Sequence, residues 1–215
     1  TGEFDPASFT GTTSDGKITV GEQIGRGGFS WVFRGRQVST GQEVAIKFPS
    51  RPGEACKRLT RGRKLLGQLN HPNIAKLVDA GSTTLGTVRL PYVAMELVRD
   101  ARSLSAFCRE ENLDLPARLE VFAAICDAVA AAHVRNVIHR DLKPGNILIS
   151  GSGHPCVIDF DIADTSKADL TTLATSDSTR GGNAFTPLYA SPEQYDFRSP
   201  PQTGTSDQQT GGLTP

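Results

Sequence analysis

The regular pattern of the chain begins at Ile18, where an alternating arrangement starts that runs through Val20 and Glu22 to Ile24. Alternation with a period of two is typical of a β-strand that buries one face. Further stretches rich in β-branched and apolar residues follow, bounded by turn residues. The predicted strands comprise residues 18–24, 30–38, 43–48, 75–80 and 91–98. The short turn Ser-Thr-Gly-Gln at 39–42 joins the second strand to the third and indicates an antiparallel meander rather than a βαβ unit.

Between the third and fourth strands the spacing becomes helical. Apolar and small residues recur at steps of three and four, which predicts one helix with a single inward stripe. The stripe consists of Ala55, Leu59, Gly62, Leu66 and Leu69. The other faces carry Lys57, Arg58, Arg61, Arg63 and Lys64. We interpret these cations as a solvated helix face rather than as a docking patch.

A longer helix is predicted over residues 115–133, with Pro116 in its first turn. Its periodicity indicates that one face is turned toward a core. That face is expected to contain Leu119, Phe122, Ala123, Cys126, Val129 and Ala130.

Together these elements predict an α+β protein of two lobes. Residues 1–16 lack periodicity and are expected to be a disordered lead, and residues 17–98 are expected to form a small lobe of five strands and one helix. Residues 99–195 are expected to form part of a second, mainly helical lobe. Residues 196–215 are rich in Pro, Gly and Thr and predict a tail that holds only the truncated start of a further helix.

The composition agrees with a soluble globular chain. Of 215 residues, 37% are hydrophobic and 21% are charged, with 23 basic residues against 23 acidic ones. The neutral balance gives no indication of a nucleic-acid partner, and the four widely spaced cysteines, without a CxxC pair, indicate reduced thiols. The sequence contains neither an apolar run of about 18 residues, as a membrane span requires, nor a signal-peptide pattern. We therefore expect a cytoplasmic location.

The strongest chemical signal is the stretch HRDLKPGN at residues 139–146, which follows the long helix and precedes the apolar run 147–149. It places the carboxylate of Asp141, the ammonium of Lys143 and the carboxamide of Asn146 at the spacing of a phosphoryl-transfer site. A loop between packed elements is also where catalytic groups commonly converge. The competing interpretation is a polar turn that carries its charges by chance.

Two upstream features agree with phosphoryl transfer. The stretch GRGG at residues 25–28 lies between two antiparallel strands, where glycines let backbone N–H groups approach phosphates, although an ordinary flexible hairpin is the alternative. Lys47 ends the third strand, and alternation places it on the same face as Ala45 and opposite Val44 and Ile46. An exposed strand lysine is common, but at this distance after a glycine flap we expect Lys47 to hold the α- and β-phosphates of a nucleotide.

The order of these motifs resembles that of the eukaryotic-like (Hanks-type) Ser/Thr protein kinases, and residues 188–194 (LYASPEQ) look most like their bacterial branch. The resemblance covers about residues 17–210. It implies a bilobal fold with an antiparallel five-stranded N-lobe, one helix in that lobe and an incomplete, mainly helical C-lobe. It also implies ATP and Mg²⁺ as cofactors and Ser or Thr hydroxyls of protein substrates as acceptors. A dimer for trans-autophosphorylation is a further expectation from the same resemblance.

The resemblance assigns roles to single residues. Asp141 matches the catalytic base, Lys143 a lysine that contacts the γ-phosphate, and Thr186 a threonine that contacts both of these residues. Asn146 and Asp159 match the ligands of two magnesium ions. The expected ATP-binding residues are Ile24, Gly25, Gly27, Gly28, Val32, Ala45, Lys47, Met95, Glu96, Val98 and Leu148. The apolar column that links the lobes of active kinases is matched by Leu66, Leu77, His139 and Phe160.

Several positions depart from the family pattern. The glutamate that pairs with the strand lysine should fall at position 62, where this chain has Gly62, and the nearest upstream acid, Glu54, lies roughly 12 Å away along the helix. Asp161 stands where the DFG motif has glycine, and Phe185 and Ser191 are milder changes. These departures leave open a pseudokinase or an ATP-binding regulatory module, and the short C-terminal part leaves open an inactive kinase fragment.

The Ser and Thr residues between positions 165 and 179 lie in the expected activation segment and are candidate phosphorylation sites. Arg140, beside the catalytic aspartate, is the expected receptor of such a phosphate. The alternative is a Ser/Thr-rich loop that is simply flexible. Residues 206–213 resemble a degraded form of the family's next helix start.

Overall fold

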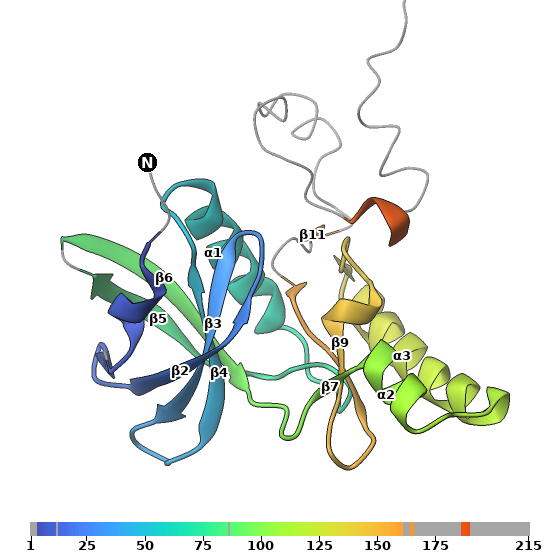
Figure 1. The fold of residues 1–215 in the computed structure, drawn as a ribbon. Coiled ribbons are helices and arrows are strands. Elements are labelled where there is room, and N and C mark those ends of the chain that lie inside the picture. Colours follow the sequence, from blue (N-terminus) through green and yellow to red (C-terminus); the bar gives the residue numbers. More distant parts are fainter. Residues whose placement is uncertain (1–3, 12, 86, 161–163, 166–185, 190–215) are drawn as a thin grey trace, which may run out of the picture.

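The computed structural model describes residues 4–11, 13–85, 87–160, 164–165 and 186–189. Figure 1 shows them in two lobes, a strand-rich N-lobe with helix α1 and a C-lobe that contains helices α2 and α3. The N-lobe strands are β1 Thr13–Ser14, β2 Ile18–Arg26, β3 Ser30–Gln37, β4 Glu43–Pro49, β5 Leu77–Leu85 and β6 Val88–Glu96. They form one antiparallel sheet in the order β1-β2-β3-β4-β6-β5. The predicted five-stranded sheet is therefore confirmed, and the short strand β1 extends it at one edge.

The N-terminal segment is folded where the structure describes it, although the sequence predicted a disordered lead over residues 1–16. Residues Pro6–Phe9 form a 3-10 helix, η1, and β1 pairs with β2. Phe9 is 1% exposed, and its ring stacks on Phe48 with the ring centroids 4.6 Å apart. A few aromatic contacts hold this segment rather than a regular apolar face, so periodicity could not reveal it.

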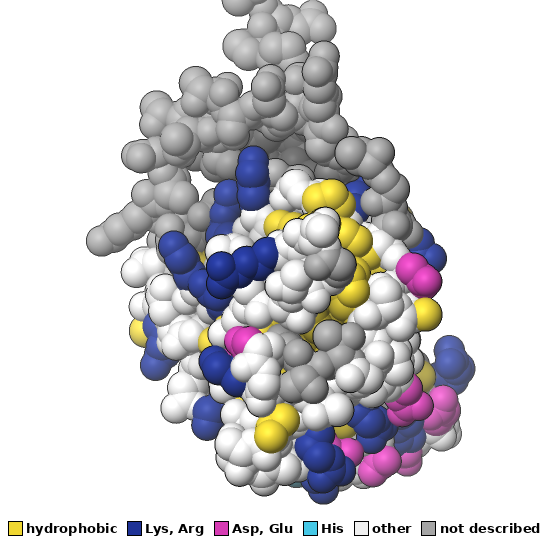
Figure 2. Space-filling model, turned by 90° about the vertical axis from the view of Figure 1, so that its left-hand side faces the viewer, with side chains coloured by type: hydrophobic (Ala, Val, Ile, Leu, Met, Phe, Trp, Pro, Cys, Tyr) yellow, Lys and Arg dark blue, Asp and Glu magenta, His cyan; other side chains and the backbone are white. Residues whose placement is uncertain are grey.

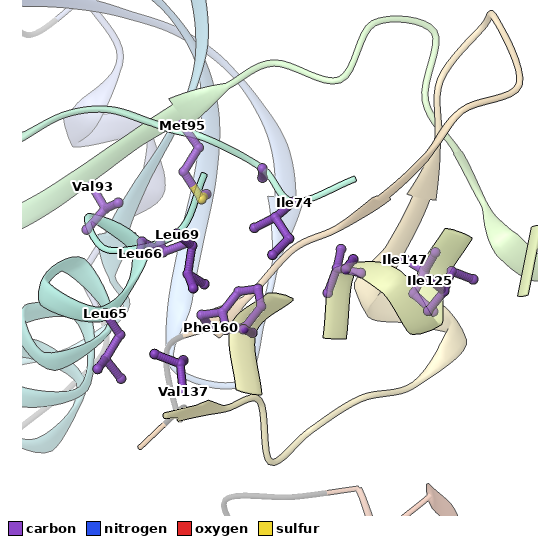
Figure 3. Packing of buried hydrophobic residues seen from close by; sticks show 14 of the residues in the cluster. Leu65, Leu66, Leu69, Ile74, Val93, Met95, Ile125, Val137, Ile147 and Phe160 are labelled. Atoms are coloured by element: carbon purple, nitrogen blue, oxygen red, sulfur yellow. The ribbon is translucent and has the colours of Figure 1, made fainter. Parts of the chain in front are cut away.

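Two clusters of buried side chains stabilise the two faces of the sheet. The cluster under η1 comprises Phe9, Ile18, Val20, Trp31, Phe33, Val44, Ile46, Phe48, Leu90, Tyr92 and Ala94. The other cluster joins the lobes, and Figure 3 shows Leu66, Ile74 and Met95 of the N-lobe side together with Phe160 and Val137. Because buried side chains from both lobes share one cluster, the lobes have a continuous apolar connection.

Helix α1 spans Glu54–Leu66 and begins after Gly53, whose φ of 83° lies in the left-handed region that favours glycine. The buried positions of the predicted stripe are Ala55, Leu59, Gly62, Leu66 and Leu69. The prediction that one helix carries all five is wrong at its end, because α1 stops at Leu66. Two backbone hydrogen bonds in the following turn, from Gln68 to Leu65 and from Leu69 to Leu66, return Leu69 to the same cluster.

The described part of the C-lobe combines α-helices and 3-10 helices with short strands. Its elements are β7 Arg102–Ser103, α2 Leu104–Glu110, α3 Leu115–Val134, β8 Val137–Ile138, the 3-10 helix η2 Pro144–Asn146, β9 Ile147–Ile149, β10 Pro155–Val157, β11 Asp164–Thr165 and the 3-10 helix η4 Pro187–Tyr189. Strand β9 lies between β10 and β7, and β8 pairs with β11. Asp114 caps α3 by accepting a hydrogen bond from the backbone N–H of Ala117, which fixes where the long helix begins.

The predicted inward face of α3 is wrong. Leu119 and Phe122 are 56% and 62% exposed, and the buried residues are Ile125, Ala128 and Ala132. Of the other predicted positions, Ala123, Cys126 and Ala130 are exposed and Val129 is half-buried. This helix is apolar on several sides, so periodicity alone could not select the face. The two small alanines let α3 approach β8 and β10 closely, whereas no element within the described residues covers the Leu119 face.

On the face drawn in Figure 2, Lys and Arg side chains gather at the upper left, whereas basic and acidic side chains lie mixed at the lower right. On α1, Lys57, Arg61 and Lys64 are exposed, in agreement with a solvated face. All four cysteines are free, as expected, and burial, helped by Glu96, raises the pKa of the Cys156 thiol to about 11. Among the helices that the structure describes, none is sufficiently long and apolar to span a bilayer.

Candidate active site

A cavity of about 1120 Å³ lies between the lobes, bounded by the β2–β3 hairpin, strand β4, the segment after β6 and the loop before β9. Every site residue expected from the sequence lines this cavity. The N-lobe contributes Ile24, Gly25, Gly27, Gly28, Val32, Ala45, Lys47, Met95, Glu96 and Val98, and the C-lobe contributes Asp141, Lys143, Asn146, Leu148 and Asp159. The fold thus collects apolar walls, cations and carboxylates from distant parts of the sequence around one space.

The apolar walls of the cavity come from neighbouring strands. Ala45 on β4 lies opposite Met95 on β6 in the sheet register, and Val32 on β3 lies opposite Lys47. At the edge of this wall Glu96 lines the cavity, and its backbone N–H donates to the carbonyl of Lys76 over 2.9 Å, so this N–H is already used within the fold. Apolar walls with one convergent polar edge suit a flat heteroaromatic ring.

Polar contacts in the catalytic loop converge on Asp141. Its Oδ1 accepts hydrogen bonds from the backbone N–H of Thr186 at 2.9 Å and from the Thr186 hydroxyl at 2.8 Å. Its Oδ2 accepts from Nδ2 of Asn146 at 3.1 Å and lies 2.7 Å from Nζ of Lys143. The Lys143 ammonium also donates to the Thr186 hydroxyl at 2.6 Å. These contacts fix the carboxylate in one orientation at the floor of the cavity.

His139 fixes the backbone of the same loop. Its Nε2 lies 2.8 Å from the carbonyl of Ile158, and its Nδ1 accepts from the backbone N–H of Asp141 at 3.3 Å. A ring with its proton on Nε2 satisfies both hydrogen bonds. The His139 ring also packs against Phe160, with centroids 4.6 Å apart, which ties the loop to the residue that follows Asp159.

Residues of the expected apolar column pack in one buried cluster or against it. Leu66 and Phe160 belong to one buried cluster, and Leu77 packs against it. Figure 3 shows Phe160 beside Leu69 and Val137, on the side of the C-lobe that faces α1. The column therefore connects α1, the sheet and the catalytic loop.

Lys47 and Asp159 form the ion pair at the back of the cavity. Lys47 is 2% exposed, and its Nζ lies 2.6 Å from Oδ1 of Asp159. Ala45 and Lys47 line the cavity while Val44 and Ile46 enter the opposite cluster, which confirms the strand alternation inferred from the sequence. Burial disfavours the charged carboxylate, but the ammonium of Lys47 outweighs it and holds the pKa of Asp159 below its ordinary value.

Helix α1 contributes no carboxylate at the position where the family pattern has one. Gly62 is buried on the inward stripe of the helix and has no side chain to offer Lys47. One helical turn earlier, Arg58 lines the cavity, whereas the sequence placed it on the solvated face. Its guanidinium carbon lies 3.9 Å from the ring centroid of Phe29, a second lining residue that sequence reasoning missed. The only signal for this pair in the sequence is an aromatic residue inside the glycine-rich hairpin.

Comparison with known proteins agrees with this geometry. A family profile described as "Protein kinase domain" matches residues 18–208. The chain belongs to the protein kinase family. The kinase domain is 33% identical over 201 residues to a probable serine/threonine-protein kinase of Corynebacterium efficiens, with 91% of this chain and 29% of the relative covered.

Another bacterium and a plant also supply similar relatives. The serine/threonine-protein kinase PknB of Mycobacterium tuberculosis is 35% identical over 183 residues, covering 83% of this chain and 28% of the relative. A putative CBL-interacting protein kinase of Oryza sativa is 33% identical over 187 residues, covering 83% of this chain and 34% of the relative. The kinase domain therefore spans about a third or less of the length of these relatives.

Some expectations fall outside the described residues. These are Asp161, the segment with the candidate phosphorylation sites beyond Thr165, Phe185, Ser191 and residues 206–213. Within the described part, no cluster of three His, Cys, Asp or Glu side chains forms a ready metal site. Asn146 and Asp159 nevertheless fit magnesium, because Mg²⁺ in kinases is held by few protein oxygens together with nucleotide phosphates. Asn146 uses its Nδ2 for Asp141, which leaves its amide oxygen for the cation.

Proposed function

We propose that this kinase domain transfers the γ-phosphate of ATP to Ser or Thr hydroxyls of protein substrates. The observation that carries the proposal is the carboxylate of Asp141, which Thr186, Asn146 and Lys143 hold in one orientation. A carboxylate oriented before the substrate binds can accept the proton of an attacking hydroxyl without further rearrangement. The relatives named above as serine/threonine-protein kinases support the same reaction.

The surrounding cations suit the charge that develops during phosphoryl transfer. Lys143 lies beside both Asp141 and Thr186, so its ammonium can neutralise the γ-phosphate next to the base. Lys47 would hold the α- and β-phosphates, with Asp159 keeping its ammonium in place. Asn146 and Asp159 would hold Mg²⁺, which when bound neutralises charge on the β- and γ-phosphates.

The nucleotide base would occupy the apolar end of the cavity. Val32, Ala45 and Leu148 would enclose the ring, and the carbonyl oxygen of Glu96 would accept a hydrogen bond from its amino group. We further propose that the domain acts in the cytoplasm, where ATP and protein substrates are present. Phosphorylation of one copy by another is part of the proposal and requires at least transient dimers.

The test is transfer of label from γ-³²P-ATP to a mixture of unstructured Ser-, Thr- and Tyr-containing polypeptides, with the full 215-residue chain as enzyme. We expect phosphoserine and phosphothreonine but no phosphotyrosine. The Asp141→Asn variant should lose the transfer, whereas Asp127→Asn, an exposed aspartate on α3, should keep it. Equal transfer by Asp141→Asn and the wild type would remove Asp141 as the base.

A regulatory module that binds ATP without transferring phosphate is the second candidate. Gly62 favours it, because glycine stands where the family pattern has the glutamate that pairs with the strand lysine. The same assay separates the two functions when ATP affinity is measured in parallel. Tight ATP binding without any transfer by the wild type would support the regulatory module.

A further inference from the structure

The tip of the β2–β3 hairpin places an aromatic ring at the mouth of the cavity. Phe29 stands between Gly28 and Ser30, is half-buried and lines the cavity. The backbone N–H of Gly27 donates to the carbonyl of Ser30 at 2.8 Å, and the carbonyl of Phe29 accepts from the N–H of Ser50 at 2.9 Å. The tip is thus a tight turn that is fastened to the end of β4.

Two guanidinium groups approach the Phe29 ring from the side of α1. The Arg58 guanidinium carbon lies 3.9 Å from the ring centroid, within cation–π range, and the Arg51 guanidinium carbon lies at 5.4 Å. Arg51 also reaches the carbonyl of Gly28 at 3.5 Å. Arg58 is half-buried, and partial removal of water strengthens a cation–π contact. Arg58 therefore has the shorter and better protected contact with the ring.

The position of Arg58 gives this contact a role in the site. Arg58 precedes Gly62 by one helical turn, so α1 offers a cation to the hairpin close to the position where the family pattern has a glutamate. The hairpin carries the glycines that would approach the phosphates, and Arg58 lines the same cavity. A helix that contacts the hairpin in this way can set how closely the hairpin covers a bound nucleotide.

We propose that Arg58 is a positioning residue that holds the glycine-rich hairpin over the phosphates of ATP by stacking on Phe29. The inference rests on the proposed function, because it concerns the nucleotide site of that function. The inference goes beyond the proposed function because it gives α1 a connection to the nucleotide that does not pass through Lys47. Arg58 acts through the ring, so its effect depends on Phe29 and on the presence of phosphates.

The first test compares the affinities of ATP with Mg²⁺ and of adenosine for the full chain by titration calorimetry. Arg58→Ala should raise the Kd for ATP about tenfold, the size of a partly desolvated cation–π contact, and leave the Kd for adenosine unchanged. Arg61→Ala is the matched control, because Arg61 is an exposed arginine on the same helix, and it should change neither Kd. Unchanged ATP affinity in Arg58→Ala, or equal weakening of ATP and adenosine, would overturn the proposal.

The second test asks whether Arg58 acts through the ring. Phe29→Ala should weaken ATP binding to a similar extent, and Arg58→Ala introduced into Phe29→Ala should have no further effect. A full additional loss in the double variant would mean that Arg58 acts without the ring, which contradicts the proposal. Arg58→Lys, which keeps the charge without the flat guanidinium, should have intermediate affinity and serves if the alanine variant does not fold. A wild-type chain that binds neither ligand would instead refute the proposed function itself.

Discussion

The two sides of the cavity are held by different means. On the catalytic-loop side, Asp141 accepts hydrogen bonds from Asn146 and Thr186 and lies 2.7 Å from the ammonium of Lys143. On the N-lobe side, the buried Lys47 meets a carboxylate from the C-lobe, Asp159, while α1 presents a glycine at position 62. The first side is a network within one lobe, and the second includes the glycine-rich hairpin and an ion pair that joins the two lobes.

This difference separates the chemistry from the alignment of the nucleotide. Groups in a connected network lose their geometry together when one partner is removed, whereas the pair between Lys47 and Asp159 involves none of the contacts described for Asp141. Changes on the loop side should therefore lower the rate of transfer at constant ATP affinity. Changes on the N-lobe side should alter ATP affinity as well.

The largest effect that separates the two sides is expected from Lys47→Met. Removal of the ammonium breaks the ion pair with Asp159 and takes the expected cation away from the α- and β-phosphates. ATP affinity and transfer should therefore fall together, transfer by about 100-fold. Steady-state kinetics with ATP titrations measures both quantities. Lys57→Met, at an exposed position of α1, is the matched control and should retain both. If Lys47→Met lost transfer at unchanged ATP affinity, the N-lobe side and the loop side would not differ in their effect on ATP binding.

A smaller effect is expected from Thr186→Ala. The variant keeps the backbone N–H that donates to Asp141 but loses the hydroxyl that bridges Asp141 and Lys143. Loss of one charge-assisted hydrogen bond should lower kcat about tenfold with the KM for ATP unchanged. Thr186→Ser retains the hydroxyl and should restore most of kcat. If the serine variant is as slow as the alanine variant, loss of the hydroxyl that bridges Asp141 and Lys143 does not explain the lower kcat.

A change in the opposite direction is expected from Gly62→Glu. A carboxylate on the inward stripe would give Lys47 a second acidic neighbour, and a contact worth about 1 kcal/mol should raise transfer about fivefold. Gly62→Ala controls for helix propensity, because it should stabilise the fold by about 1 kcal/mol without raising transfer. If Gly62→Ala raised the transfer rate as much as Gly62→Glu, the gain would come from the more stable helix and not from the added charge.

The smallest effect concerns pH. Because the pKa of Asp159 is lowered in the folded chain, its pair with Lys47 contributes stability that is complete above the ordinary carboxyl pKa of about 4 and is lost as the pH falls through the lowered value. Lys47→Met removes the main influence that opposes burial and leaves the weaker ones of His139 and Lys143, so the pKa of Asp159 should rise. Carboxyl ¹³C chemical shifts followed against pH would show the change. An identical titration in both proteins would contradict the assigned cause.

The strands and the cavity could be predicted from the sequence because their patterns are local. Alternation alone placed Ala45 and Lys47 on the cavity face and Val44 and Ile46 on the other. The catalytic loop carries its chemistry within eight consecutive residues, so its members needed no tertiary information to be found. Local patterns therefore account for Lys47 and the catalytic loop, whereas the resemblance to protein kinases supplied most of the other expected residues that line the cavity.

The remaining features depend on packing between distant segments. The burial of Phe9 rests on rings from other strands, and the face that α3 buries is set by the small side chains of Ala128 and Ala132. Arg58 has the same sequence signature as its exposed neighbour Arg61, and only the folded hairpin distinguishes the two through Phe29. Contacts between segments that are distant in the sequence, and not residue type, determine where these side chains lie.

The claim that Asp141 performs the chemistry in a cavity that binds ATP is tested most directly by one paired measurement on Asp141→Asn. ATP affinity and the single-turnover rate of phosphate transfer are determined in the same preparation. The account predicts an ATP Kd within about twofold of the wild-type value and a transfer rate at least about 100-fold lower. A variant that transfers phosphate at the wild-type rate, or one that loses ATP binding to the same extent as transfer, would contradict it.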